Sequence, residues 1–154
     1  MIIRFYKPSD QNEVCKLHED TVRNINDKDY SKEQIETWPG ILDNYSKLGD
    51  SLMNSNSYVA VIADKIVGFG DISNDGHISR LYTHKDFQGL GIGSKILSKL
   101  EEKAKSLGLK EINLESTISA KSFYQKKGFK VLKKVTCEIK GVKHEDWKMR
   151  KILK

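Results

Sequence analysis

A glycine-rich turn at residues 88–94 carries the side chains and backbone best suited to chemistry. It reads Gln-Gly-Leu-Gly-Ile-Gly-Ser and follows residues 77–83, where apolar and polar residues alternate as in a half-buried strand. After it, apolar residues recur at helical spacing from Ile92 to Leu107. Such a turn exposes backbone N–H groups at a helix N-terminus, and these groups bind phosphate. The turn therefore indicates a phosphate or pyrophosphate site, or else only a tight connection between a strand and a helix.

Two common phosphate-binding motifs fit this turn poorly. A dinucleotide-binding fingerprint needs a glycine three residues after its second glycine, and Ser94 stands there instead. A P-loop needs lysine directly after its last glycine, but Lys95 comes one residue too late. The spacing does match Gln-x-x-Gly-x-Gly, which begins at Gln88.

A second element lies about thirty residues downstream, at residues 119–129. It follows the pattern Ala-x-x-Phe-Tyr-x-x-x-Gly-Phe, with Ala120 first and Phe129 last. An apolar helical stripe, a glycine at the helix C-terminus and an aromatic residue that enters the next strand are typical of a short helix.

With these two elements in this order, the chain resembles the GCN5-related N-acetyltransferases (GNAT). The resemblance covers residues 56–152, whereas the first 55 residues match only in the order of their elements. It implies one N-acetyltransferase domain over residues 1–154, with an α/β (α+β) GNAT fold. That fold is a mixed, mostly antiparallel central sheet flanked by helices, in the order β-α-α-β-β-β-α-β-α-β-β. It also implies direct transfer from acetyl-CoA to a small-molecule primary amine. A CoA-binding module without transfer activity and a protein or peptide N-acetyltransferase are the alternatives.

The resemblance also implies roles for individual residues. Tyr124 matches the tyrosine that faces the CoA sulfur, where a phenol with a pKa of about 10 can donate a proton to a thiolate. Otherwise Tyr124 is a core aromatic. Thr117 stands where family members often carry asparagine, so its contact with the pantetheine arm departs from the pattern. The cofactor-binding residues are then Leu81, Tyr82, Thr83, Gln88, Gly89, Leu90, Gly91, Ile92, Gly93, Ser94, Thr117, Ala120 and Phe123.

The general base and the acceptor pocket are less sharply defined by the sequence. His77 opens the strand before the turn, at a position where some family members carry a base, and imidazole can accept a proton near neutral pH. Asp71 and Glu115 are rival carboxylates, and a water chain is a further alternative. Tyr30, Trp38 and Asp71 are the candidate contacts to the acceptor, although plain core packing also explains Trp38.

Composition indicates a single globular domain of 154 residues, with 38% hydrophobic and 31% charged residues. The sequence has no run of eighteen apolar residues and no signal-peptide pattern, so we expect neither a membrane partner nor export. Cys15 and Cys137 are isolated, which favours reduced thiols in the cytoplasm. The histidines and cysteines lack metal-ligand spacing, so no metal is expected. A homodimer is possible, since dimers are common in the family.

Charge differs between the two halves of the chain. Residues 1–76 hold 8 basic and 13 acidic residues, whereas residues 77–154 hold 19 and 8. The basic half contains the phosphate-binding turn, which suits an anionic cofactor, and the acidic half suits a cationic amine. Lysine-rich solvated helix faces would also produce this pattern. Only four basic residues are arginine and none is interleaved with aromatics, which argues against nucleic-acid binding.

The remaining elements follow from periodicity and turn residues. The motifs Asp10-x-x-Glu13 and Ser31-x-x-Gln34 predict capping boxes, the second opening a helix through Ile35 and Trp38 toward Leu42. Residues 46–57 are polar and are predicted to form a loop, and residues 118–127 a helix. The predicted strands are 2–6, 58–63, 65–72, 77–83, 111–115, 130–139 and 142–152.

Overall fold

The computed structural model describes residues 1–41 and 44–154. Within these ranges the N-terminal half contains β1 (Ile2–Phe5), the short 3-10 helix η1 (Pro8–Asp10), α1 (Gln11–Asn24), η2 (Asn26–Lys28), α2 (Lys32–Glu36) and α3 (Tyr45–Met53). The rest contains β2 (Asn56–Ile62), β3 (Lys65–Ile72), β4 (His77–Thr83), α4 (Ile92–Ser106), β5 (Glu111–Ser116), α5 (Lys121–Lys126), β6 (Lys130–Ile139) and β7 (Val142–Ile152).

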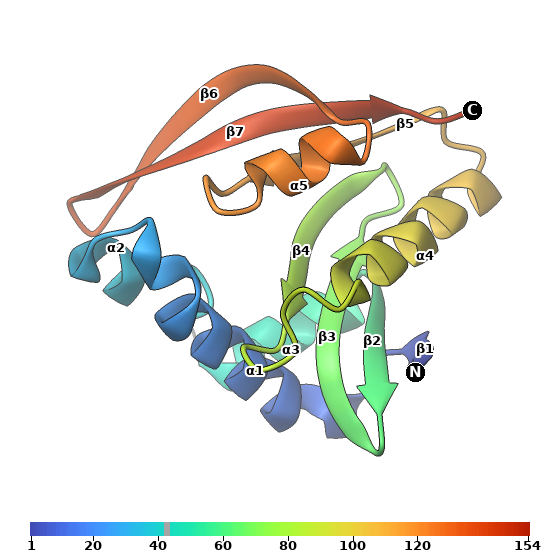
Figure 1. Cartoon of the computed structure of the whole chain (residues 1–154), viewed down its shortest axis with the longest axis horizontal. Coiled ribbons are helices and arrows are strands. Elements are labelled where there is room, and N and C mark those ends of the chain that lie inside the picture. The colour runs from blue at the N-terminus through green and yellow to red at the C-terminus, as the bar shows by residue number, and fades with distance from the viewer. Residues whose placement is uncertain (42–43) are drawn as a thin grey trace.

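The described strands form one mixed sheet in the order β1-β2-β3-β4-β5-β7-β6. Neighbouring strands are antiparallel except β4 and β5, which are parallel and pair only at His77–Asn113 and Ile78–Leu114. Beyond Ile78, β4 stays paired with β3 while β5 stays paired with β7, so the two strands separate (Figure 1). The predicted mixed, mostly antiparallel sheet is confirmed, and it is divided by a gap between β4 and β5.

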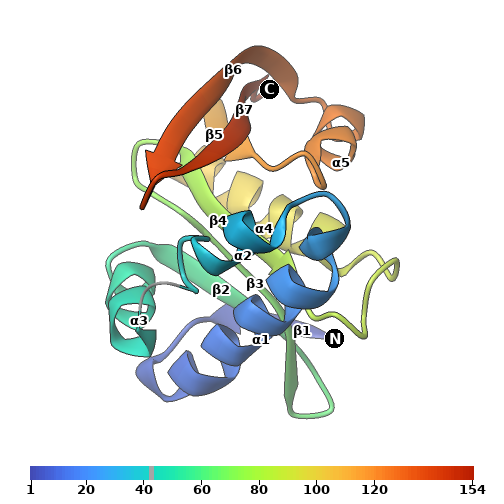
Figure 2. The same ribbon diagram turned by 90° about the vertical axis from the view of Figure 1, so that its left-hand side faces the viewer.

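Helices cover both faces of the sheet, with α1 and α2 on one side of β3 and β4 and α4 on the other (Figure 2). Alternation along β2 and β3 sends Val59 and Phe69 into a cluster with α1 and α3. Their neighbours Tyr58 and Ala60 on β2 pack instead into the larger cluster with α4 and α5. Val67 also packs there, because the register of the β2–β3 pair shifts beside it. The central strands are therefore buried on both faces, and they form a rigid support for the loops that follow them.

Two glycines in β3 allow α4 to lie close to the sheet. A Cβ atom on Gly68 would lie 2.8 Å from Ile96 Cδ1, and one on Gly70 would lie 3.0 Å from Ile96 Cγ2. A side chain at either position would push α4 away from the strand. These glycines therefore help to set the position of the α4 N-terminus, which lies beside the gap.

The N-terminal half contains a helix that the sequence did not predict. Residues 46–57 were expected to form a loop, but α3 spans most of them and its N-cap Asn44 accepts a hydrogen bond from the Lys47 N–H. Only Leu48 and Leu52 give α3 an apolar stripe, and both are buried. The short polar sequence hid this helix, which tertiary packing stabilises.

Both helices begin at the predicted residues, but only one of the two predicted capping boxes forms. Ser31 and Gln34 form the expected reciprocal bonds, although α2 ends at Glu36, Trp38 lies beyond it, and Leu42 falls outside the described residues. Asp10 is the N-cap residue of α1, but its side chain makes no capping hydrogen bond; its carboxylate binds Arg4 at 2.8 Å and the Lys7 N–H at 3.0 Å. Helix α5 is also shorter than the predicted 118–127. In the described residues, no helix combines the length and the apolar character that crossing a membrane requires.

Candidate active site

A cavity of about 430 Å³ occupies the gap between β4 and β5, and we call it the turn cavity because the glycine-rich turn lines it. Almost all of the predicted cofactor-binding residues line it, although they come from β4, the glycine-rich turn, α4, the β5–α5 loop and α5. The exception is Leu90, whose side chain is 66% exposed and points away. The predicted residues that line the turn cavity are Leu81, Tyr82, Thr83, Gln88, Gly89, Gly91, Ile92, Gly93, Ser94, Thr117, Ala120, Phe123 and Tyr124.

The glycine-rich turn leaves unpaired N–H groups beside this cavity. Gly89 and Gly91 have φ angles of +75° and +79°, which residues with a side chain rarely adopt. A Cβ atom on either glycine would meet no heavy atom within 4 Å, so the space above the turn is open. Gly91 is the N-cap of α4 and provides no side-chain cap, which leaves the first N–H groups of the helix without a partner. This arrangement suits a diphosphate.

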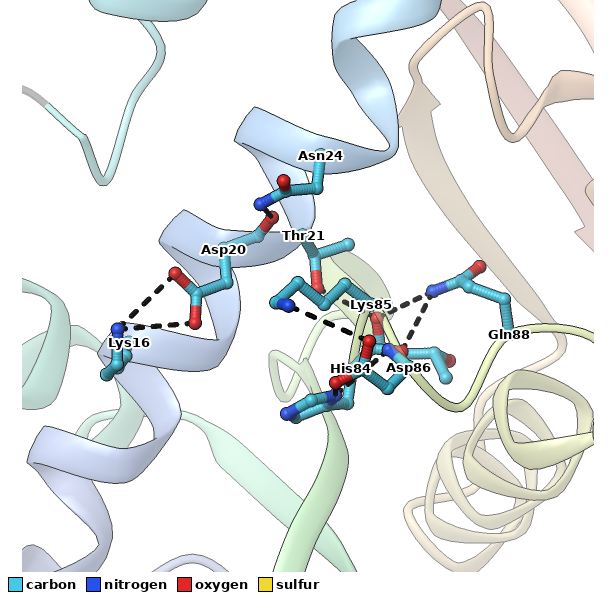
Figure 3. Close-up of polar contacts among 9 residues, drawn as sticks. Lys16, Asp20, Thr21, Asn24, His84, Lys85, Asp86 and Gln88 are labelled. Carbon is cyan, nitrogen blue, oxygen red and sulfur yellow. Dashed lines mark hydrogen bonds and ion pairs between the residues drawn. The ribbon is translucent and has the colours of Figure 1, made fainter.

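Side-chain bonds fix the turn to the end of β4. Gln88 Nε2 donates to the Thr83 carbonyl at 2.8 Å and to the His84 carbonyl at 3.2 Å. Thr21 Oγ1, from α1, donates to the same Thr83 carbonyl at 2.9 Å, and Figure 3 shows Thr21 and Gln88 converging on this strand end. Inside the loop, the Asp86 N–H donates to His84 Nδ1. The sequence predicted that the backbone N–H of Gln88 contacts the phosphate group. In addition, the side chain of Gln88 fixes the position of the turn.

The two sequence motifs meet in space at the start of α4. The Phe123 Cζ atom and the Thr83 Oγ1 atom each lie 3.6 Å from the position that a Cβ atom on Gly93 would take. Phe123 and Tyr124 are adjacent on α5, and Gly128 with φ +95° ends that helix. The short α5 therefore carries its aromatic residues against the glycine-rich turn.

Tyr124 lines the turn cavity from a buried position. Its ring packs edge-on against Phe123 and Phe129, and it is 6% exposed. Burial raises the pKa of the Tyr124 phenol well above its ordinary value of 10, with a smaller contribution from Tyr82. The hydroxyl makes no hydrogen bond to another residue in the described part of the chain. It therefore stays protonated and is free to donate into the cavity.

A second cavity, of about 320 Å³, lies between the N-terminal helices and the β6–β7 hairpin, and we call it the hairpin cavity. Tyr30 and Trp38, two of the three predicted acceptor contacts, line it, and so does His77, the predicted base. It adjoins the turn cavity where β4 and β5 separate, because the two cavities share part of their lining. The residues that line both cavities are Ile78, Ser79, Arg80, Tyr82, Glu115 and Thr117.

Aromatic side chains form one wall of the hairpin cavity. Tyr30 and Trp38 pack edge to face at 4.9 Å, and Trp38 Nε1 donates to the Tyr82 hydroxyl at 3.3 Å. The Tyr30 hydroxyl accepts from the Ile118 N–H at 2.7 Å, and burial raises the pKa of this phenol to about 12. Trp38 also packs in a core cluster, so it is both a core residue and a wall of the cavity.

Bonds between α2 and the β6–β7 hairpin close this cavity on a further side. Gln34 Nε2 donates to the Lys143 carbonyl at 3.1 Å, and Thr37 Oγ1 lies 2.7 Å from His144 Nε2. Nothing in the sequence indicated this pairing, since 109 and 107 residues separate the partners.

The candidate bases occupy different environments. His77 Nδ1 lies 2.6 Å from Asn113 Oδ1, and because a carbonyl oxygen only accepts, this contact favours the tautomer of a neutral imidazole that has its proton on Nδ1 and its lone pair on Nε2. Glu115 lines both cavities. Asp71, expected to be an acceptor contact or a base, instead lies buried outside both cavities and pairs with Arg80 at 3.2 Å. Burial raises the pKa of Asp71, while Arg80 opposes that shift.

The sequence analysis missed Asp146, a carboxylate on β7 that lines the hairpin cavity. Burial raises its pKa to about 6, and the nearby charge of Glu115 adds to that shift. In the sequence, the one sign of a functional residue was a charged residue beside Trp147 within a predicted strand. Only the pairing of β5 with β7 places Asp146 near Glu115. Among the described residues no three His, Cys, Asp or Glu side chains are grouped to hold a metal ion.

Comparison with known proteins agrees with this geometry. The family model described as acetyltransferase (GNAT) domain matches residues 26–152. The uncharacterized N-acetyltransferase YafP of Escherichia coli K12 is 30% identical over 149 residues, which cover 96% of this chain and 93% of YafP.

Solved structures show the same fold. A protein from Rhodopseudomonas palustris, described as a GCN5-related N-acetyltransferase and as an aminotransferase of class II, aligns with a TM-score of 0.94 and 26% identity, over 99% of this chain and 95% of that one. The PaiA N-acetyltransferase of Thermoplasma acidophilum, solved in complex with coenzyme A, aligns with a TM-score of 0.81 and 24% identity, over 99% and 98%. From its sequence, its fold and its relatives, this chain belongs to the GNAT family and is an N-acetyltransferase.

Proposed function

We propose that this enzyme, acting as one domain over residues 1–154, transfers an acetyl group from acetyl-CoA to a primary amine of a small molecule. The transfer is direct, within a complex that holds both substrates. The main support for the proposal is that the turn cavity and the hairpin cavity lie next to each other at the gap between β4 and β5 and share lining residues there. A donor in one cavity and an acceptor in the other would place their reacting atoms at that junction.

The turn cavity fits CoA. The open space above Gly89 and Gly91, together with the unpaired N–H groups at the start of α4, suits the pyrophosphate. Residues 79–83 of β4 have no strand partner on the side that faces β5. The Thr83 carbonyl is held by Thr21 and Gln88, which leaves the backbone groups of residues 79–82 to pair with the amide-rich pantetheine arm. Acetyl-CoA supplies the acetyl group as a thioester. The relative solved in complex with coenzyme A supports this use of the fold.

Two residues of the chain hold and move protons in this proposal. Tyr124 keeps its phenolic proton at neutral pH and presents it in the turn cavity, where the departing sulfur must receive one. His77 lines the hairpin cavity, and in its neutral form with Nδ1–H bound to Asn113 its Nε2 can accept the proton of the amine directly or through water. The remaining contribution of the protein is to bring the two substrates together.

The enclosure of the hairpin cavity favours a small acceptor over a protein or peptide. Tyr30 binds Ile118 across one side, and the bonds of Gln34 and Thr37 to the β6–β7 hairpin close another. A peptide chain needs an open groove with free backbone groups, whereas these contacts join the cavity walls to each other. The aromatic wall suits the carbon skeleton of a small amine.

The cytoplasm is the proposed setting of the reaction. Cys15 is buried and Cys137 is exposed, and both are free thiols. Free thiols fit a reducing compartment, where acetyl-CoA is also made and consumed.

The proposal is tested by removing the Tyr124 hydroxyl. Tyr124→Phe should lower kcat by roughly 100-fold, measured by the release of free CoA thiol, while calorimetry shows CoA affinity within about threefold of wild type. Tyr58→Phe is the matched control, because Tyr58 is another buried tyrosine and lines neither cavity. Unchanged turnover in Tyr124→Phe would exclude its role, and CoA binding without transfer to any amine would favour a CoA-binding module.

A further inference from the structure

Some of the charged side chains that line the hairpin cavity pair with an opposite charge of the protein, and others do not. Arg80 is held by both oxygens of Asp71 and by Ser51 Oγ at 2.7 Å. Glu145 pairs with Lys134 at 3.3 Å and with Lys143 at 3.1 Å. Their charges are therefore matched within the protein.

Glu115 and Asp146 are different. Across the described residues, neither carboxylate makes a hydrogen bond or an ion pair with a cationic side chain, although both line the hairpin cavity. Asp146 is only partly exposed, and its charge also raises the pKa of the phenols of Tyr30 and Tyr82, so these groups surround the same space. Two neighbouring carboxylates without a counter-ion repel each other, and a bound cation would stabilise both.

The position of Asp146 indicates which part of the acceptor it contacts. Tyr124 lines only the turn cavity, Asp146 lines only the hairpin cavity, and Glu115 lines both. The nitrogen that attacks the acetyl group must reach the junction of the cavities and must be uncharged when it reacts. A cation beside Asp146 is therefore a group other than the reacting nitrogen.

We propose that Glu115 and Asp146 bind a second cationic group of the acceptor, so that the substrate is a diamine of which one nitrogen is acetylated and the other stays charged. This inference rests on the proposed function. Tyr30, Trp38 and Tyr82 lie along the carbon chain between the two nitrogens, and aromatic faces also attract ammonium groups. Asp146 is a positioning residue, since it acts on substrate orientation and not on the reacting atoms.

An acceptor with a carboxylate fits the same cavity poorly. Of the described residues, two cationic side chains line the cavity, Lys47 and Arg80. Buried Asp71 already neutralises Arg80 from 3.2 Å, and Lys47 also has a partner of its own. A substrate carboxylate would also face Glu115 and Asp146, and like charges at close range destabilise binding.

Three acceptors of equal chain length test the inference: 1,4-diaminobutane, butylamine and 4-aminobutanoate, each assayed at neutral pH with saturating acetyl-CoA. We expect kcat/KM for the diamine to exceed that for butylamine at least tenfold, mainly through KM, because a charged hydrogen bond contributes about 1.5–3 kcal/mol. The amino acid should be the poorest acceptor. Asp146→Asn should reduce the preference for diamine over monoamine to within about threefold.

Glu138→Gln is the control, because Glu138 is an exposed carboxylate on β6 that lines neither cavity, and it should keep the wild-type preference. Equal kcat/KM for diamine and monoamine in wild type would overturn the inference, as would a preference for 4-aminobutanoate or an unchanged preference in Asp146→Asn. If calorimetry shows that Asp146→Asn no longer binds CoA, Glu115→Gln replaces it under the same criterion. If none of these three amines is acetylated, the diamine inference is overturned, whereas the proposed function fails only if no amine of a broad panel is acetylated by enzyme that binds CoA.

Discussion

The most discriminating prediction concerns the glycine-rich turn, because a substitution there should change CoA affinity and folding stability through separate physical causes. Gly91 has a φ of +79° and caps α4 at the edge of the turn cavity. A methyl group on it would meet no protein atom within 4 Å, so Gly91→Ala creates no internal clash. Its cost to folding is the left-handed backbone alone, about 1–2 kcal/mol. For a chain of this size that corresponds to a fall in Tm of roughly 2–8 °C.

The same methyl group would enter the open space where the phosphate must approach the helix N-terminus. Loss of one charge-assisted hydrogen bond costs about 1.5–3 kcal/mol, so the Kd for CoA should rise about 10- to 150-fold. The assay is titration calorimetry with CoA, together with the KM for acetyl-CoA and thermal unfolding of the same preparations.

Gly108→Ala is the matched control. Gly108 follows α4 at its other end, has a φ of +76°, has no atom within 4 Å of a Cβ position and lines neither cavity. It should lose the same Tm as Gly91→Ala and bind CoA as wild type does. CoA affinity that is unchanged in Gly91→Ala, or equally weakened in both variants, would refute the assignment of the turn.

Three further predictions concern groups around the site. Asp71→Asn leaves Arg80 without its buried counter-ion and should lower the free energy of unfolding by roughly 3 kcal/mol in urea titrations; no change would show that the pair is not structural. Burial lowers the pKa of His18 from 6.5 to about 4, so between these two pH values His18 is protonated in the unfolded chain but not in the folded one. The free energy of unfolding should therefore fall as the pH drops from about 6.5 to about 4. In His18→Leu, the fall in the free energy of unfolding over this pH range should be smaller than in wild type by roughly 3 kcal/mol. A variant with the same pH profile as wild type would contradict this prediction. Thr37→Val breaks the contact with His144 and should raise the KM of the amine severalfold at constant KM for acetyl-CoA; a change in both constants would count against separate cavities.

The chemistry at the gap was predictable because local patterns encode it. The β4 strand occupies the predicted residues 77–83, since an alternating pattern ends there at a glycine-rich turn. The turn and the Phe123–Tyr124 pair follow β4 and β5, the two strands that border the gap. Sequence order therefore brought both motifs to one end of the sheet, where Phe123 lies against Gly93.

Other features depend on long-range packing that no local pattern records. Asp71 sits in an alternating stretch that suggests an accessible side chain, but β3 is covered on both faces. Asp146 faces the hairpin cavity only because β7 pairs with β5 in one register, and a shift of one residue would turn it away. Helix α3 has two buried leucines as its only strong signal, and its contacts with α1 and β2 stabilise it.

A crystal structure of the enzyme with bound CoA tests the central claim most directly. We expect the pyrophosphate on the N–H groups at the start of α4, the pantetheine arm along residues 79–82, and the sulfur within hydrogen-bonding reach of the Tyr124 hydroxyl. The sulfur should lie at the junction with the hairpin cavity. CoA bound elsewhere, or a sulfur that points away from both Tyr124 and the junction, would contradict it.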